Sequence, residues 1–183
     1  MPRQKLSRLM MMNLTTPIDL EDKLIELVKG KRLVILFVGS PSRGDDGAPQ
    51  LLFRNLQRKA VRMKLLDCGT SPQDCIEVAR LEPDIVIFVN AIDRSLTAGT
   101  IVLEELHATN STGSSLVSHK FPLAWVASLL EMTRPRQDLM IRVILIGIQI
   151  RSTKGRITIP IRKSANQLLR IFKKMDLIIE SFT

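Results

Sequence analysis

Three runs of consecutive apolar residues constrain the fold of this chain more than any other feature. Residues 33–38 read LVILFV, residues 85–89 read IVIFV, and the predicted strand at residues 141–148 reads IRVILIGI, which is fully apolar after Arg142. Such runs, rich in β-branched side chains, are typical of strands that are covered on both faces in a parallel sheet. We expect two further strands, at residues 61–66 and 100–103, the second of them antiparallel at an edge of the sheet.

Helical patterns separate these strands, with apolar side chains recurring every three or four residues. The predicted helices begin near Asp19, Gly47, Pro72, Phe121 and Ile161. The alternation of strands and helices predicts an α/β fold: a single-domain, twisted, mostly parallel five-stranded sheet with helices on both faces.

The length of 183 residues is that of one domain. Residues 1–18 show no clear period and are predicted to be a flexible N-terminal arm, followed by one α/β domain at residues 19–183. Residues 106–118 are rich in Ser, Thr, Asn and Gly and are predicted to form a long loop, which in a compact domain is often functional. No apolar run approaches 18 residues, so we expect no membrane-spanning helix.

Two cysteines, Cys68 and Cys75, are too few for a disulfide framework and lack Cys-x-x-Cys spacing. The apolar patch at residues 9–12 is shorter than the core of a secretory signal. We therefore expect a cytoplasmic protein in a reducing compartment, with Cys68 as a small buried thiol rather than a nucleophile.

The net charge is +9, and its source is uneven. Residues 134–174 contain eleven Lys and Arg but a single acid, Asp138. A basic surface attracts nucleic acid, an acidic membrane or an acidic protein, or is simply solvated. The stretch has one aromatic residue, Phe172, and no nucleic-acid-binding motif, so we predict a docking or solvated surface without specific nucleic-acid binding.

The loop after the first predicted strand, GSPSRGDDG at residues 39–47, lies where ligands bind in such sheets. It is not a dinucleotide loop, because Pro41 replaces the second glycine. It is not a phosphate loop either, because Asp45 and Asp46 replace the Lys and the Ser or Thr. From the residues alone, the acids either cap the following helix, the favoured interpretation, or act as a cation ligand or catalytic acid.

Two other polar positions share this edge of the predicted sheet. Asn90 directly follows the third apolar run, and His119 lies in the segment SHKFPL before a helix. A carboxylate from Asp46 and an imidazole from His119 suit a borderline divalent ion such as nickel or zinc. His107 has no surrounding pattern and is interpreted as a surface residue.

Five segments, in this order, resemble the hydrogenase maturation endopeptidases, which trim the C-terminal tail of the large subunit of nickel-iron hydrogenases. The resemblance covers about residues 32–175. The segments are Val38-Gly39 with the SRGDDG loop, Gly69-Thr70-Ser71-Pro72, Val89 to Asp93, Ser118-His119 with Pro122-Leu123, and Gly147-Ile148-Gln149.

The resemblance implies a divalent-metal site with three side chains, Asp46, Asn90 and His119. The family has an Asp where this chain has Asn90, and a neutral amide is a weaker ligand that cannot act as a base. Asp46 and His119 would be the catalytic residues, with Asp46 as ligand and candidate base. The supporting residues would be Gly44, Asp45, Gly47, Gly69, Thr70 and Asp93.

The resemblance also implies a function: a metal-dependent or aspartic-type endopeptidase that removes the C-terminal extension of a nickel-iron hydrogenase large-subunit precursor. Nickel would be carried by that precursor and recognised there, and zinc or cadmium would occupy the site in vitro. Two alternatives remain open. One is a non-catalytic relative that binds the nickel-loaded precursor as an assembly factor, suggested by Asn90, and the other is a basic binding module.

Overall fold

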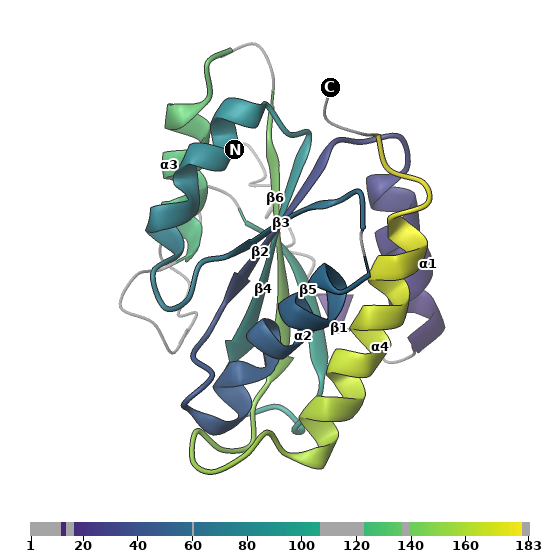
Figure 1. The fold of residues 1–183 in the computed structure, drawn as a ribbon, viewed down its shortest axis with the longest axis vertical. Helices are drawn as coiled ribbons and strands as arrows, with labels where there is room; N and C mark the ends of the chain where they lie inside the picture. The colour runs from purple at the N-terminus through teal and green to yellow at the C-terminus, as the bar shows by residue number, and fades with distance from the viewer. Residues whose placement is uncertain (1–11, 14–16, 60, 107–122, 137–139, 181–183) are drawn as a thin grey trace, which may run out of the picture.

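The computed structural model describes residues 12–13, 17–59, 61–106, 123–136 and 140–180. Six strands form one sheet in the order β1-β5-β6-β4-β2-β3, and helices cover both of its faces (Figure 1). The elements are β1 (Met12–Asn13), α1 (Pro17–Val28), β2 (Leu33–Val38), η1 (Gly44–Gly47), α2 (Ala48–Gln57), β3 (Lys64–Asp67), η2 (Pro72–Leu81), β4 (Ile85–Ile92), β5 (Ile101–Leu106), α3 (Leu123–Thr133), β6 (Arg142–Gln149) and α4 (Ile159–Met175).

The strand pairing confirms the predicted mostly parallel α/β sheet. The central strand β4 runs parallel to β2 on one side and to β6 on the other, and β2 runs parallel to β3. β5 is antiparallel to β6, as predicted for a strand reached by a short connection. At the end of that pair, the Glu105 carboxylate accepts two hydrogen bonds from Arg142 and raises the pKa of its guanidinium.

Two details of the sheet differ from the prediction. β1 pairs antiparallel with β5, so β5 is not the edge strand and the sheet gains a sixth, two-residue member. β3 begins at Lys64 rather than at residue 61, and it is only half-buried. The backbone just before β3 bonds to a residue outside the sheet: the N–H of Met63 donates a hydrogen bond to the carboxylate of Asp176, which follows α4.

The apolar runs are buried because alternate residues enter two cores. Ile85, Ile87 and Val89 of β4 pack in the core shared with α1, α2 and α4. Val86 and Phe88 of the same strand pack in the core shared with η2 and α3. Figure 1 shows α3 on one side of the sheet and α1 and α4 on the other. The alternation places the side chain of each strand residue on a known face.

The N-terminal part is described only in pieces. Met12–Asn13 forms β1 and α1 begins at Pro17, while most of residues 1–18 lie outside the described ranges. The division into a flexible arm and a domain from residue 19 stays a prediction. The predicted long loop at residues 106–118 also lies almost entirely outside these ranges.

Cys68 is buried as predicted, but the prediction that it is a free thiol is wrong. Cys68 and Cys75 form a disulfide that joins the end of β3 to η2, and both residues are buried. The predicted short helix that contains Cys75 is a 3-10 helix. Within the described residues, none of the helices combines the length and apolarity needed to cross a membrane.

Candidate functional site at the carboxyl edge of the sheet

The loop that carries Asp45 and Asp46 folds back onto the end of β2. The N–H of Ser40 donates to the Asp46 carbonyl at 3.1 Å, and the N–H of Gly39 donates to the Gly69 carbonyl at 2.7 Å. A Cβ at position 39 would lie 2.2 Å from the Asp46 carbonyl oxygen. Glycine at position 39 is therefore what allows the aspartate loop to lie against the strand end.

Asp45 is fully buried, and its carboxylate holds a distant segment of the chain. It accepts hydrogen bonds from the N–H groups of Arg151 (2.9 Å), Ser152 (3.0 Å) and Thr158 (2.6 Å), and from the Thr158 hydroxyl (3.1 Å). Thr158 is the residue that precedes α4. The expectation that Asp45 stabilises the start of its own helix is therefore wrong, because its oxygens are committed to the loop before α4.

Gly44 allows this loop-to-loop contact. Its φ is +52°, and an added Cβ would lie 2.8 Å from the Ser152 carbonyl oxygen and 2.9 Å from that of Lys154. The N–H of Asp45 also donates to the Ser152 carbonyl at 2.9 Å. Gly47 is similarly confined, since its Cβ would lie 3.0 Å from the Cα of Pro41. The predicted supporting residues Gly44, Asp45 and Gly47 thus build one rigid loop.

Asp46 and Asn90 are both fully buried at this edge. η1, which carries Asp46, packs against β4, which carries Asn90. Asn90 stands between Val38 of β2 and Gly147 of β6 in the sheet register. Within the described residues, neither the oxygen nor the nitrogen of its side-chain amide has a hydrogen-bond partner. Buried amides without a hydrogen-bond partner are rare, so a ligand, an ion or a water molecule is expected to bind the side chain of Asn90.

The side chain of Asn90 lies on the α3 side of the sheet, because it alternates with Val86 and Phe88. His119 precedes α3 in the sequence but lies outside the described residues, as do His107 and Ser118. In the ranges that are described, no three His, Cys, Asp or Glu side chains gather as a metal site. Of the three predicted metal ligands, the structure therefore describes two, the carboxylate of Asp46 and the amide of Asn90.

A hydrogen-bonded group that the sequence analysis missed supports the loop from the side of β3. Gln50 of α2 is buried and donates from its amide to the Asp67 carboxylate at 3.2 Å. The same oxygen of Asp67 accepts from the N–H of Gly69 at 3.0 Å. Asp67 is the last residue of its strand. A polar residue at the end of an apolar run is the signal that pointed to Asn90, and the same signal would have found Asp67. Thr70 is exposed beside this group.

A second such group fixes the ends of β4 and β6. The buried Gln149 amide donates to Asp93 at 3.1 Å and accepts from the N–H of Arg94 at 2.8 Å. The guanidinium of Arg94 pairs with Glu104 at 2.7 Å. An added Cβ on Gly147 would lie 2.6 Å from Cδ1 of Ile92, so the Ile92 side chain packs against this glycine. Asp93 therefore contacts Gln149 rather than the aspartate loop.

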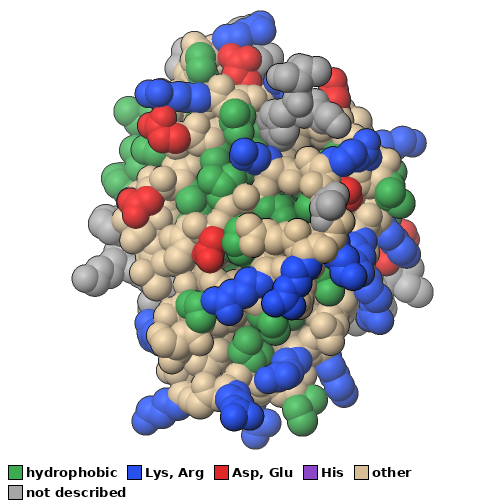
Figure 2. All heavy atoms as spheres, viewed as in Figure 1, with side chains coloured by type: hydrophobic (Ala, Val, Ile, Leu, Met, Phe, Trp, Pro, Cys, Tyr) green, Lys and Arg blue, Asp and Glu red, His purple; other side chains and the backbone are tan. Residues whose placement is uncertain are grey.

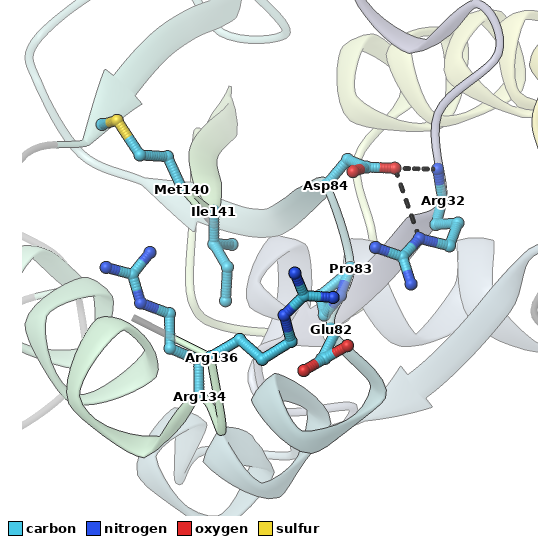
Figure 3. A pocket seen from close by; sticks show the side chains of 8 residues that line it. All are labelled: Arg32, Glu82, Pro83, Asp84, Arg134, Arg136, Met140 and Ile141. Atoms are coloured by element: carbon cyan, nitrogen blue, oxygen red, sulfur yellow. Dashed lines mark hydrogen bonds and ion pairs between the residues drawn. The ribbon is translucent and has the colours of Figure 1, made fainter. Parts of the chain in front are cut away.

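A small pocket lies at the opposite, amino edge of the sheet (Figure 3). It holds about 30 Å³, which is room for roughly one water molecule. Asp84 closes one side by accepting from the N–H of Arg32 at 2.8 Å. The pocket is too small for a peptide. Its lining residues are Arg32, Glu82, Pro83, Asp84, Arg134, Arg136, Met140 and Ile141.

Comparison with known proteins is consistent with this geometry. A family model described as hydrogenase maturation protease matches residues 50–176, which begin just after the aspartate loop. Among curated proteins, no sequence gives a significant match to the chain.

Solved structures resemble most of the chain. The crystal structure of the [NiFe] hydrogenase maturation protease HycI from Thermococcus kodakarensis KOD1 has a TM-score of 0.71 at 26% identity, covering 85% of this chain and 99% of that one. The solution structure of the endopeptidase HycI from Escherichia coli has a TM-score of 0.62 at 26% identity, covering 75% and 86%. The hydrogenase maturating endopeptidase HybD from E. coli shares the fold, with a TM-score of 0.56 at 20% identity and coverage of 78% and 93%.

Proposed function

The chain belongs to the hydrogenase maturation protease family, and we propose that it removes the C-terminal extension of a nickel-iron hydrogenase large-subunit precursor. The observation that carries this proposal is the buried aspartate loop packed against β4 at the carboxyl edge of the sheet. This edge is where α/β folds place their ligands. The likeness to two HycI structures supports it.

In the proposed reaction, water adds to the carbonyl carbon of the scissile peptide bond. The Asp46 carboxylate accepts a proton from that water, and the proton passes to the amine that leaves when the C–N bond breaks. Asp45 has no part in this transfer, because its oxygens are occupied by the loop before α4. Its role is to hold Asp46 in place.

Nickel enters the proposal as part of the substrate. We infer that Asp46, Asn90 and His119 recognise the ion that the precursor carries, because carboxylate and imidazole are suitable nickel ligands. The amide oxygen of Asn90, which has no hydrogen-bond partner among the described residues, is available for the same contact. Being neutral, it attracts the ion less than a carboxylate would, so the isolated protein should bind free nickel, zinc or cadmium weakly. The cysteine ligands of the precursor would supply the rest.

We place the reaction in the cytoplasm. The proposed partner is the folded large-subunit precursor. Specific nucleic-acid binding is not part of the proposal.

The proposal is tested by incubating the protein with a nickel-loaded large-subunit precursor and measuring the mass of the product. The parent should shorten the precursor, and Asp46→Asn should slow cleavage by about a hundredfold. Asp74→Asn, which changes an exposed acid of η2, is the matched control and should cleave like the parent. If the Asp46→Asn variant shortens the precursor as fast as the parent does, the assignment of Asp46 as the catalytic residue is refuted.

Asn90→Asp separates an enzyme from a non-catalytic relative. It restores a charged oxygen at the same place, so free nickel or cadmium should bind more tightly in calorimetry, while cleavage persists or improves. His119→Ala should weaken metal binding, whereas His107→Ala should not. If the parent cleaves nothing but Asn90→Asp does, the natural protein is a binding relative.

A further inference from the structure

One face of the molecule carries almost all of the excess positive charge. Residues 47–66 contain five Lys and Arg and no acid, and residues 139–175 contain nine and no acid. These segments include α2 and α4, which pack side by side on the same face of the sheet. We define the cationic face by ten exposed side chains: Arg54, Arg58, Lys59, Arg151, Lys154, Arg156, Arg162, Lys163, Arg170 and Lys173.

Among the residues that the structure describes, ion pairs do not neutralise the charge of this face. None of the ten side chains forms an ion pair with another described residue. The ion pairs of the described residues lie outside this set, for example between Lys174 and Glu21 and between Arg142 and Glu105. Figure 2 shows the result: Lys and Arg side chains gather across the lower half of the view, while most acidic side chains lie higher. A surface of this kind attracts an anionic partner.

The cationic face is continuous with the candidate site. Asp45 binds the backbone of the segment that carries Arg151, and Gly44 lies within close contact of Lys154. On its other side, η1 runs directly into α2. The aspartate loop therefore lies at the rim of the cationic face, and a large substrate seated at the site would also cover its nearest cations.

Side-chain chemistry favours a protein as the occupant. Nucleic acid and membranes are also anionic, but proteins that bind single strands stack bases on exposed aromatic side chains, and membrane-surface helices insert exposed apolar side chains. The aromatic residues of the two helices are turned inward: Phe172 is fully buried, and Phe53 packs on Phe37. Most apolar residues of α4, such as Leu168, are also buried; Ile159, its first residue, is exposed, and one such side chain is little apolar surface to insert into a membrane.

We propose that the cationic face docks an acidic surface of the folded large-subunit precursor beside its scissile tail. This inference rests on the proposed function. It adds that the enzyme recognises a surface of the precursor outside the cleavage site. Charge complementarity of this kind speeds encounter and fixes register, and salt weakens it. The cationic face should therefore govern precursor binding and leave the chemical step unchanged.

The test uses two double variants that change the net charge equally. Lys163→Glu with Arg170→Glu alters two exposed side chains of α4, neither of which makes a hydrogen bond in the described structure. Lys29→Glu with Lys31→Glu alters two exposed side chains at the amino edge, beyond the cationic face. Circular dichroism checks that both variants are folded.

The measured quantities are the dissociation constant for the nickel-loaded precursor at 50 and 300 mM salt and the cleavage rate at saturating precursor. At low salt, the α4 variant should bind about tenfold more weakly than the parent. The Lys29/Lys31 control should bind like the parent within about twofold. High salt should bring the parent close to the α4 variant, and the saturated cleavage rates should be equal.

Each outcome decides one of the two proposals. If the parent binds the precursor through the cationic face but cleaves nothing, docking stands and the proposed function fails. If the parent cleaves and the α4 variant binds no more weakly than the control, docking is overturned and the function stands. Docking is also overturned if duplex DNA or phosphatidylserine vesicles bind the parent more tightly than the precursor does at 150 mM salt.

Discussion

Asp45 shows how one buried charge can organise a site without entering the chemistry. Its two oxygens accept from three backbone N–H groups and one hydroxyl, all from residues 151–158. Hydrogen bonds to a charged group contribute more to stability than neutral ones, and a buried charge without them is costly. The neighbouring aspartates therefore have distinct roles, Asp45 in structure and Asp46 in the proposed reaction.

Asp45→Asn should lower the free energy of unfolding by about 2 kcal/mol, because an amide keeps one acceptor oxygen and turns an NH₂ group toward backbone donors. Urea denaturation measures the effect. Asp74→Asn, at an exposed position, should change it by less than about 0.5 kcal/mol. Equal stabilities for the two variants would contradict the structural role of Asp45.

Gly39→Ala should be more damaging than its small size suggests. The new methyl group would lie 2.2 Å from the Asp46 carbonyl oxygen, so the aspartate loop must move. We expect a loss of about 3 kcal/mol in unfolding free energy, together with loss of metal binding.

The matched control for Gly39 is Gly30→Ala. Gly30 has a φ of +62° and no atom near the added methyl group, so it should cost only about 1 kcal/mol. Thermal unfolding compares the two variants directly. A Gly39 variant as stable as the Gly30 variant would mean that the loop does not lie against β2 as described.

At the scale of elements, the sequence predicts the strands and helices that have a hydrophobic pattern of their own. The apolar runs at residues 33–38 and 85–89 correctly predicted β2 and β4, because a strand that is buried on both faces is apolar at every position and is easily recognised. β1 was not predictable, because its two residues have no pattern of their own and gain strand structure from β5.

The site was predictable only in part for the same reason. Strand-end position and family resemblance pointed to Asp46 and Asn90, but the partner of Asp45 is 106 residues away in the chain. No local pattern carries such a contact. The Cys68–Cys75 disulfide was missed because composition argued for reduced thiols, whereas the fold brings the two side chains together.

That disulfide closes the turn between β3 and η2, with a sequence separation of 7. Replacing both cysteines with Ser should lower the free energy of unfolding by about 2 kcal/mol, since short loops are stabilised less than long ones. Reducing the parent with dithiothreitol should have the same effect. Trapping of thiols during cell lysis, followed by mass spectrometry, measures how much of the pair is oxidised in the cytoplasm that we propose.

At the scale of the whole molecule, the cationic face repels itself. Ten exposed cations lie on one face and have no acidic partner among the described residues, so they repel one another and oppose compaction, and dissolved salt screens that repulsion. Raising sodium chloride from 10 to 300 mM should therefore increase the stability of the parent by about 1 kcal/mol, or roughly 3 °C in the unfolding midpoint.

The Lys163→Glu, Arg170→Glu variant should already be stabilised at 10 mM salt and should respond less to added salt. Differential scanning calorimetry measures both midpoints. A parent whose midpoint is independent of salt would show that the cations of this face are too well solvated to interact.

The long reach of Asp45 has a consequence for the order in which a ribosome makes this protein. The aspartate loop emerges early, yet the N–H groups that its buried carboxylate needs belong to Arg151, Ser152 and Thr158. Until those residues leave the exit tunnel, the loop cannot take its folded form. A nascent or truncated chain that stops before Thr158 therefore lacks donors that hold the aspartate loop in its folded form.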